Sequence, residues 1–319
     1  MKYTIFTSGK INLGLTIVDK LPDGYHEIES IFLPVGIFDK ITCEFNLDKN
    51  NKTIEISEMF YKTSEFPEIP TTKDNIVWKV VEFIEKSLNI EIGFKIHIEK
   101  NIPIGAGIGG GSGNGAGVFI TLLDYLRKHN MINDKKLEYL NNEIHKIGSD
   151  IPFFLKGGGC IVQGKGEKIT TISGLFEKFQ NYNIILVFPN IFSSTREAYK
   201  FISENKLYDK ERWAHTIANK IVKEEIKIND LKKMLKNTFE LFIIEPIVRD
   251  IKEYLYLRGA MFSLMSGSGS CVYGIFERGI NLLEIKSELI NKFKFQDKQV
   301  FTTRFIKEPV KYFTSWRFV

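Results

Sequence analysis

The stretch Asn101–Val118, NIPIGAGIGGGSGNGAGV, decides how the rest of the chain is interpreted, because eight of its eighteen residues are glycine. Glycine has no side chain to bury and loses the most backbone entropy on folding, so we predict a loop here rather than a packed helix or strand. Before the loop, Ile90–Glu99 alternates apolar and polar residues as a half-buried strand does, and after it Ala116–Leu126 is apolar enough for a buried helix. A strand, a glycine loop and a helix N-terminus direct free N–H groups at one point, which predicts a phosphate site.

Two glycine patterns offer competing interpretations of the chain. Gly105–Gly110 satisfies the GxGxxG pattern of dinucleotide-binding folds. The predicted strand ends several residues before this pattern, however, and Asn130 stands where such a fold places an acidic residue. Gly159–Lys165 fits the GxxxxGK part of a P-loop, but Gly166 follows where a Mg²⁺-binding serine or threonine belongs. We set the P-loop match aside and keep a dinucleotide-dependent oxidoreductase as an alternative.

The composition is that of an ordinary globular protein, and 319 residues are enough for two domains. The net charge of +5 comes from basic residues that are scattered along the chain, so we expect no nucleic-acid partner. The three cysteines are far apart and odd in number, which favours reduced thiols in the cytoplasm over disulfides or a zinc site. The N-terminal residues have no signal-like apolar core and no apolar run has membrane-spanning length, so we expect no membrane partner.

Periodicity outlines the other elements. Strands are predicted over Lys2–Val18, Glu27–Val35 and Lys40–Phe45, and again within residues 160–187. Asp74 is predicted to cap a helix that runs to about Leu88. Further helices are predicted over residues 134–147, 195–205, 210–224, 230–236 and 239–258.

Two short segments later in the chain carry further candidates. Asp150, in the sequence GSDIPFF, lies just past a predicted helix and just before Pro152, which bars a simple continuation of that helix. Met265–Phe276, MSGSGSCVYGIF, is a second tight glycine turn that leads into a strand. From the residues alone this turn is either structural or part of a site that faces the first loop.

Six landmarks follow one another in an order that is similar to one enzyme family. They are SGKINLGL from Ser8, DGYHEIESIF from Asp23, DNI from Asp74, PIGAGIGGGSGN from Pro103, GSDIPFF from Gly148 and MSGSGSCVYGIF from Met265. Together they resemble the 4-diphosphocytidyl-2-C-methyl-D-erythritol kinases of the GHMP superfamily, over nearly the whole chain. The chain departs from the family where Gly113 and Gly115 replace a usual serine and alanine, and where the tail 312–319 runs past the usual end.

The resemblance implies roles for individual residues. Asp150 would be the general base, with Lys10 beside it to keep the carboxylate ionised and to offset charge on the acceptor hydroxyl. Asn75 and Ile76 would border the adenine. The acceptor would contact Asn12, Tyr25, His26, Thr195 and Tyr199. The phosphates of ATP would rest on the loop residues Pro103, Ile104, Gly105, Ala106, Gly107, Ile108, Gly109, Gly110, Gly111, Ser112 and Gly113.

The resemblance also implies the fold and the reaction. We expect an α+β, two-domain GHMP-kinase-like fold, with domains 1–160 and 161–319 and the active site in the cleft between them. The expected reaction is ATP-dependent phosphorylation of the 2-hydroxyl of 4-diphosphocytidyl-2-C-methyl-D-erythritol, in the non-mevalonate route to isoprenoids. Mg²⁺ would arrive with ATP, and no protein residue is assigned to it. Another GHMP kinase, of the homoserine or mevalonate type, is the nearer alternative, and the oxidoreductase and a non-catalytic nucleotide-binding protein are the more distant ones.

Overall fold

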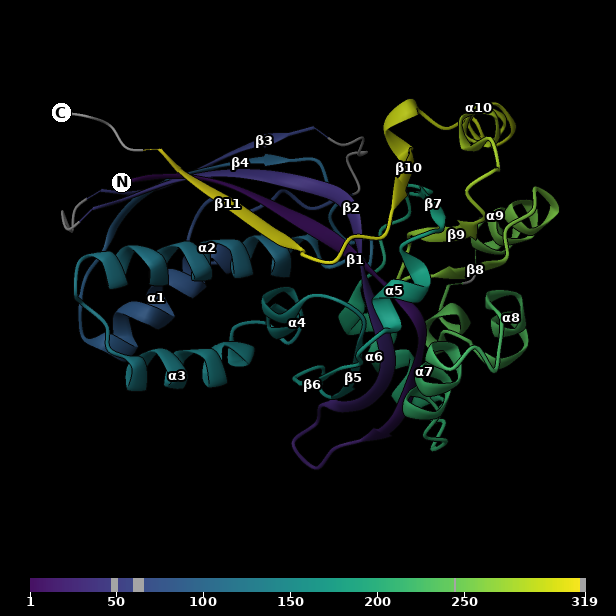
Figure 1. The fold of residues 1–319 in the computed structure, drawn as a ribbon, viewed down its shortest axis with the longest axis horizontal. Helices are drawn as coiled ribbons and strands as arrows, with labels where there is room; N and C mark the ends of the chain where they lie inside the picture. The colour runs from purple at the N-terminus through teal and green to yellow at the C-terminus, as the bar shows by residue number, and fades with distance from the viewer. Residues whose placement is uncertain (47–50, 60–65, 244, 316–319) are drawn as a thin grey trace.

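The computed structural model describes residues 1–46, 51–59, 66–243 and 245–315 of the chain. These residues form two β-sheets with helices packed around them (Figure 1). This mixture of helices and mostly antiparallel strands is the expected α+β class.

Seven of the described strands form the first sheet, in which β11, β1, β2, β4 and β3 lie side by side in that order. β5 pairs with β2, and β6 pairs with β5. All pairs are antiparallel except β3 with β4, which is parallel. The strands are β1 (Lys2–Lys20), β2 (His26–Asn46), β3 (Lys52–Glu58), β4 (Gly93–Lys100), β5 (Cys160–Gly164), β6 (Lys168–Thr171) and β11 (Val310–Ser315).

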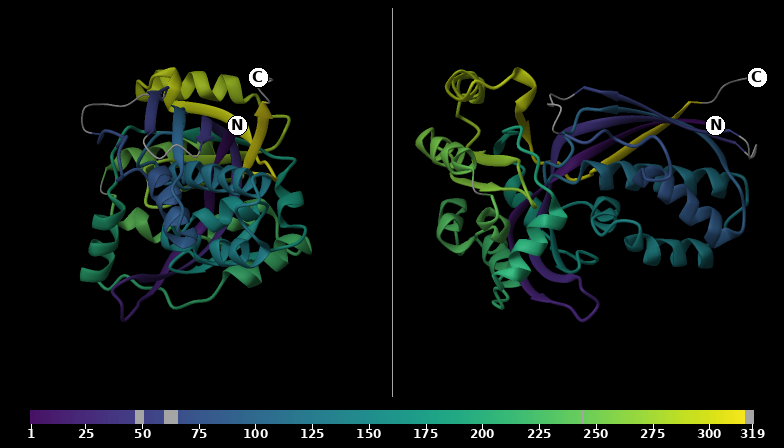
Figure 2. Two further views of the ribbon diagram at one scale, coloured as in Figure 1. Left: turned by 90° about the vertical axis from the view of Figure 1, so that its left-hand side faces the viewer. Right: turned by 180° about the vertical axis from the view of Figure 1, so that it is seen from behind.

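β1 and β2 are the two longest of the described strands, and a hairpin joins the end of β1 to the start of β2 (Figures 1 and 2). The sequence predicts two strands in the region of β2, whereas the structure has one continuous strand. Its pairing slips beside Ser8 and Gly9, where Ser8 pairs with Phe38 and Gly9 with Val35. Such a bulge bends a strand and increases its twist. The irregularity lies immediately before Lys10, which lines the cleft described below.

The second sheet contains the described strands β10 (Val300–Arg304), β7 (Asn183–Val187), β9 (Val272–Phe276) and β8 (Phe262–Met265), all antiparallel. The long helix predicted over residues 239–258 is wrong in its first part, where a short 3₁₀ turn (Thr238–Leu241) precedes a separate helix. Pro246 stands in the first turn of that helix, where its missing N–H is harmless. The described helices of this half are α5 (Leu175–Phe179), α6 (Thr195–Glu204), α7 (Ala214–Val222), α8 (Leu231–Met234), α9 (Pro246–Leu257) and α10 (Leu282–Phe293).

Helix α1 (Ile76–Leu88) begins at a different cap from the one predicted. Its N-cap is Asn75 and not Asp74, because the Asn75 side chain accepts a hydrogen bond from the Val77 N–H at 2.9 Å. Helix α3 (Asp134–Glu143) ends earlier than predicted, and a 3₁₀ turn (Ile144–Lys146) completes the segment. A short helix α4 (Ile151–Lys156) then begins directly after Asp150, with Pro152 in its first turn.

Helix α2 (Gly110–Lys128) overturns part of the first prediction, because its first two turns are built from the glycine run. The reason is close packing of this helix on strand β1. A Cβ atom at Gly113 would lie 2.9 Å from the Ser8 carbonyl oxygen, and one at Gly117 would lie 2.6 Å from the Thr7 methyl group. The glycines therefore lower helix propensity, by about 1 kcal/mol each, in exchange for a close helix–strand contact.

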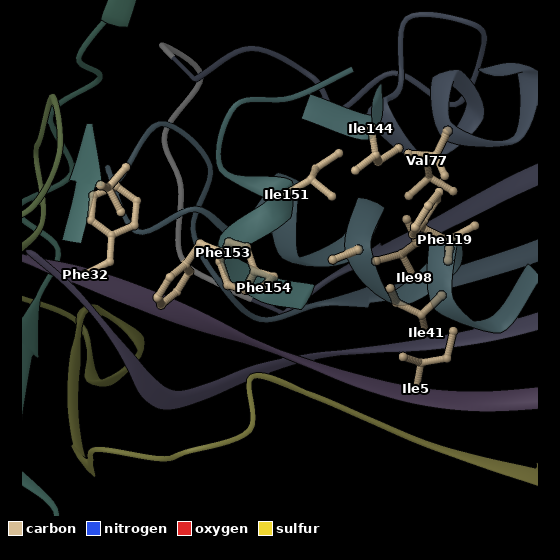
Figure 3. Close-up of a cluster of buried hydrophobic side chains, with 14 of the residues drawn as sticks. Ile5, Phe32, Ile41, Val77, Ile98, Phe119, Ile144, Ile151, Phe153 and Phe154 are labelled. Atoms are coloured by element: carbon tan, nitrogen blue, oxygen red, sulfur yellow. The ribbon is translucent and has the colours of Figure 1, made fainter. Parts of the chain in front are cut away.

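The first-sheet core lies between the sheet and the helices below it. Figure 3 shows Ile5 and Ile41 of the sheet directed toward Phe119 of α2. All three side chains are buried. Phe153 and Phe154 of α4 also belong to this core, and their rings contact each other edge to face with centroids 5.3 Å apart. Because these rings anchor α4, its N-cap residue Asp150 has a fixed place.

The expected division of the chain after residue 160 stays a prediction. Strands β5, β6 and β11 lie beyond that position and nevertheless belong to the first sheet. Among the described helices, none is long and apolar enough to cross a membrane.

Candidate active site

A cleft of about 1020 Å³ opens between the glycine loop, β1, the hairpin at its end, α6 and the turn after β8. It is lined by all the residues that the sequence placed in the site except Gly113, whose backbone packs on β1. The structure therefore brings segments from the beginning, middle and end of the chain to one place. The roles of the individual residues stay predictions.

The glycine loop is held against the second glycine turn by backbone contact. Gly107 has φ +73°, and a Cβ atom there would stand 2.0 Å from the Ser266 carbonyl oxygen. A Cβ atom at Gly267 would likewise lie 2.6 Å from the Gly107 carbonyl oxygen. Gly109 is the N-cap of α2 and makes no side-chain cap bond. The first N–H groups of a helix have no intrahelical partner, so they are available here to an anion in the cleft.

We predict that Gly107→Ala disturbs this contact far more than an ordinary change of a positive-φ glycine. Gly24 is the control, because it has φ +87° and nothing within 4 Å of a notional Cβ. Strain alone should cost Gly24→Ala about 1–3 kcal/mol. Gly107→Ala adds a backbone clash, so its melting temperature should fall clearly further in a thermal unfolding scan. Equal melting temperatures for the two variants would contradict the contact.

Lys10 and Asp150 meet at the middle of the cleft. The Lys10 ammonium is 3.8 Å from Asp150 Oδ2, and it donates to Asn12 Oδ1 and to the Gly107 carbonyl, both at 2.8 Å. It also lies 4.6 Å from the centre of the Phe32 ring. Lys10 is 3% exposed, and this burial lowers its pKa while the nearby Asp150 carboxylate opposes the shift. The arrangement places a fixed cation beside a partly exposed carboxylate.

Asn12 connects the two glycine turns beneath this pair. Its Oδ1 accepts from the Gly267 N–H at 2.8 Å and from the Ser266 hydroxyl at 3.2 Å, in addition to Lys10. Its Nδ2 donates to the Ser30 hydroxyl at 3.0 Å. The side chain is fully buried. Asn12 therefore helps to hold the Lys10 ammonium, and its contact with the acceptor stays a prediction.

Aromatic side chains gather at the hairpin end of the cleft. The His26 and Tyr199 rings are stacked with centroids 4.6 Å apart, and the Phe239 ring meets Tyr199 edge to face. His26 Nε2 is hydrogen-bonded to the Ser203 hydroxyl. Burial lowers the pKa of His26, and the charge of Lys20 adds to this effect. Because the two stacked rings touch, a flat base does not fit between them in this arrangement, and it would have to stack on an outer face or part them.

Tyr25 and Thr195 lie on the rim of the same end. Tyr25 is 61% exposed, and the Lys165 ammonium lies 4.4 Å from the centre of its ring. The Thr195 hydroxyl is 2.7 Å from the Ser268 hydroxyl, which ties α6 to the second glycine turn. This turn contributes Gly267 and Ser268 to the cleft lining, so it belongs to the cleft and is not merely a connection between strands.

The helix cap of α1 also borders the cleft. Asn75 is nearly buried, and its Nδ2 donates to the Pro70 carbonyl at 2.7 Å. Ile76 follows as the first residue of α1, and both residues line the cleft.

Several charged residues around the cleft are not predicted from the sequence, and three of them make contacts that bear on the site. Lys165 belongs to the P-loop match that is set aside above, and its place opposite Tyr25 depends on the pairing of β5 with β2. Lys100 lines the cleft and pairs with Asp39, which is completely buried. A signal for Asp39 was available, since β2 buries every second residue from Ile37 to Cys43 and Asp39 is the charged member of that series.

Known families match the chain in both halves. Residues 75–158 match the GHMP kinases N terminal domain, and residues 221–294 match the GHMP kinases C terminal domain. A protein of Sulfurihydrogenibium sp., named 4-diphosphocytidyl-2-C-methyl-D-erythritol kinase, is 38% identical over 85% of this chain and 90% of its own. A Clostridioides difficile protein of the same name is 32% identical over 89% of this chain and 90% of its own. The chain belongs to this kinase family. Its GHMP membership removes the oxidoreductase alternative.

Solved structures agree on the fold of this kinase family. A 4-(cytidine 5'-diphospho)-2C-methyl-D-erythritol kinase superimposes with a TM-score of 0.67 at 22% identity, covering 95% of this chain and 98% of its own. The mevalonate kinase of Methanococcus jannaschii superimposes with a TM-score of 0.64 at 19% identity, covering the same shares. At these identities the likeness concerns the GHMP fold and not the acceptor.

Proposed function

We propose that the protein transfers the γ-phosphoryl group of ATP to the 2-hydroxyl of 4-diphosphocytidyl-2-C-methyl-D-erythritol, the activity carried in the names of its relatives. The observation that carries the chemistry is the Lys10–Asp150 pair, 3.8 Å apart at the meeting of the two glycine turns. Phosphoryl transfer requires the phosphates to be positioned, their charge to be neutralised and the acceptor hydroxyl to be activated. The cleft offers one group of residues for each requirement.

The loop from Pro103 to Ser112 would hold the phosphates. Its backbone N–H groups and the N-terminus of α2 supply positive partial charge without a base-specific side chain. Asn75 and Ile76 would border the adenine beside the start of α1. The γ-phosphate would then point toward the Lys10 ammonium, which lies against the Gly107 carbonyl.

Asp150 would accept the proton of the acceptor 2-hydroxyl as its oxygen bonds to phosphorus and the bond to the β-phosphate oxygen of ATP breaks. Lys10 offsets the negative charge that develops on the attacking oxygen. The buried hydrogen bonds of Lys10 to Asn12 and Gly107 keep its ammonium in place while the proton moves. Such preorganisation avoids a rearrangement during the reaction.

Mg²⁺ is proposed as a companion of ATP. The described residues contain no group of three His, Cys, Asp or Glu that could hold a metal ion. This is compatible with Mg²⁺, which keeps several waters and takes most other ligands from nucleotide phosphates. The Ser112 hydroxyl and the Asp150 carboxylate are among the oxygen donors that line the cleft, and the ion would neutralise phosphate charge. The proposal also includes a cytoplasmic setting, in keeping with the three buried free cysteines.

ATP should stabilise the fold if it occupies this loop. With free ATP at 100 times its Kd, ligand linkage adds about 2.7 kcal/mol to the free energy of unfolding. A thermal scan should therefore show a clear rise in melting temperature with MgATP and none with NADH at the same concentration. A rise with NADH and none with MgATP would contradict nucleotide binding of the kinase type.

Tyr25→Ala should weaken recognition of the cytidine end of the acceptor. Loss of one stacking aromatic costs about 1–3 kcal/mol by analogy with base stacking on other proteins, so kcat/KM for the cytidyl acceptor should fall roughly ten- to a hundred-fold. Tyr25 is 61% exposed, so the fold itself should tolerate the change. The control is Tyr139→Ala, a 52% exposed tyrosine of α3 outside the cleft lining. Equal kcat/KM values for the two variants would place the cytidine elsewhere.

The proposed function is tested by ADP release with a panel of acceptors. We expect rapid release with the cytidyl compound and very slow release with methylerythritol 4-phosphate, which lacks the cytidine. Homoserine and mevalonate should also be poor acceptors. Equal rates with methylerythritol 4-phosphate, or a preference for homoserine or mevalonate, would replace the proposal by another GHMP kinase activity.

A further inference from the structure

A single buried carboxylate, that of Asp39 on β2, connects the segments that surround the glycine loop. Its Oδ1 accepts hydrogen bonds from the Asn101 and Ile102 N–H groups, both at 2.8 Å. Its Oδ2 accepts from the Asn114 side-chain amide at 3.0 Å and pairs with the Lys100 ammonium. The carboxylate thus joins the end of β4, the first residues of the loop and the second turn of α2.

Fold stability alone does not explain a charged pair in this place. The Asp39 side chain is fully buried and that of Lys100 is 6% exposed. Burial raises the pKa of Asp39, while Lys100 and the two backbone N–H groups act against this shift. Removing both charges of such a pair from water has a large desolvation cost, and apolar residues of similar volume often serve stability equally well or better. A buried pair of this kind is better explained by a need to fix one arrangement of the surrounding backbone.

The backbone that the pair fixes is the part that faces the phosphates. Lys100 and Asn114 line the cleft, whereas Asp39 does not. A Cβ atom at Gly110 would lie 2.8 Å from the Lys100 nitrogen, so the ammonium lies against the first residue of α2. Asn101 and Ile102, which Asp39 holds, directly precede Pro103 at the beginning of the loop.

We propose that Asp39 is a positioning residue for the nucleotide, which holds the beginning of the glycine loop and the N-terminus of α2 in their phosphate-binding arrangement before ATP arrives. The inference rests on the proposed function, because it requires ATP to occupy this loop. Asp39 acts through the backbone and through Lys100, and it contacts neither substrate. Its loss should therefore change ATP affinity much more than the chemical step.

The test uses the paired variant Asp39→Asn with Lys100→Met, which removes both charges and leaves no unpaired buried ion. Lys100→Met alone is the reference, because Lys100 lines the cleft and this variant removes the ammonium while Asp39 keeps its hydrogen bonds from the Asn101 and Ile102 amides. The double variant should bind ATP about ten- to a hundred-fold more weakly than Lys100→Met alone, the range expected for loss of hydrogen bonds to a charged group. Its kcat at saturating ATP should stay close to that of Lys100→Met.

The matched control is the Glu85–Lys52 pair, in which the Lys52 ammonium lies 2.7 Å from Glu85 Oε1. Glu85 also accepts a hydrogen bond from the Ile92 backbone N–H at 2.6 Å. Neither residue lines the cleft. Glu85→Gln with Lys52→Met should lower the melting temperature and leave the Kd for ATP unchanged. A Kd in the Asp39 double variant equal to that of Lys100→Met would overturn the inference, and the proposed function would stand. No ATP binding by the unaltered protein would overturn both.

Hydrogen exchange in the unaltered protein gives an independent measurement if the double variant does not fold. The Asn101 and Ile102 amides should be strongly protected without ATP, because both donate to a buried carboxylate. Exchange of these two amides at the rate of an exposed loop, with protection only after ATP is added, would overturn the inference.

Discussion

Asp150→Asn should lower kcat by about 10²- to 10⁴-fold, the usual loss when a positioned general base is removed. Asparagine keeps the size of the side chain but cannot accept the proton of the 2-hydroxyl. The Kd for ATP should change little, because the Asp150 carboxylate pairs with Lys10 and the phosphates would rest on the backbone of the loop and the start of α2. Steady-state kinetics and an ATP-binding titration measure the two effects separately.

The matched control for this prediction is Asp74→Asn. Asp74 is also a carboxylate in the cleft lining, but it stands beside the Asn75 cap of α1. Its replacement should leave kcat close to the unaltered value. Near-normal turnover by Asp150→Asn would show that Asp150 is not the general base and has only a structural role at the start of α4.

Lys10→Ala should lower kcat by roughly 10²- to 10³-fold, the range found when one preorganised stabilising donor is removed from an active site. The ammonium is within 3.8 Å of Asp150 Oδ2 and is held by Asn12 and Gly107, so its loss removes both the partner of the base and the charge facing the phosphate. Single-turnover kinetics with saturating ATP isolates this effect from binding.

The double variant Lys10→Ala with Asp150→Asn tests whether the two residues act as a unit. Residues that share one catalytic step have strongly non-additive effects, so the double variant should lose less than the product of the two single losses. A fully multiplicative loss would show that the two residues act independently, despite their proximity.

Much of the fold could be predicted from local sequence because its elements carry local signals. The apolar face of α1 and the alternation in β4 have such signals, and both elements form close to the predicted residues. Helix α2 could not be predicted in its glycine-rich part, since its propensity there is low and only contact with Ser8 and Thr7 of β1 explains it. Tertiary packing overrides propensity in such cases.

The candidate site also has a part that local sequence predicts and a part that depends on tertiary contacts. The glycine loop, Lys10 and Asp150 could be recognised because their sequence neighbours carry the family's pattern. The Asp39–Lys100 pair depends on residues 61 positions apart, and the Lys165–Tyr25 contact on residues 140 apart, 165 − 25. Such contacts arise from the pairing of strands, and a single sequence does not specify which strands pair. The stacking of His26 on Tyr199 is likewise a result of the fold and not of either segment.

The central claim, transfer of a phosphoryl group from ATP to the cytidyl acceptor, is tested most directly by the fate of a labelled γ-phosphate. The unaltered protein is incubated with the acceptor and with MgATP whose terminal γ-oxygens are ¹⁸O. The masses of the products are then measured by mass spectrometry. We predict that the acceptor gains one phosphoryl group carrying the label and that it does so only when the protein is present. Recovery of the label in inorganic phosphate alone, with the acceptor unchanged, would contradict the claim.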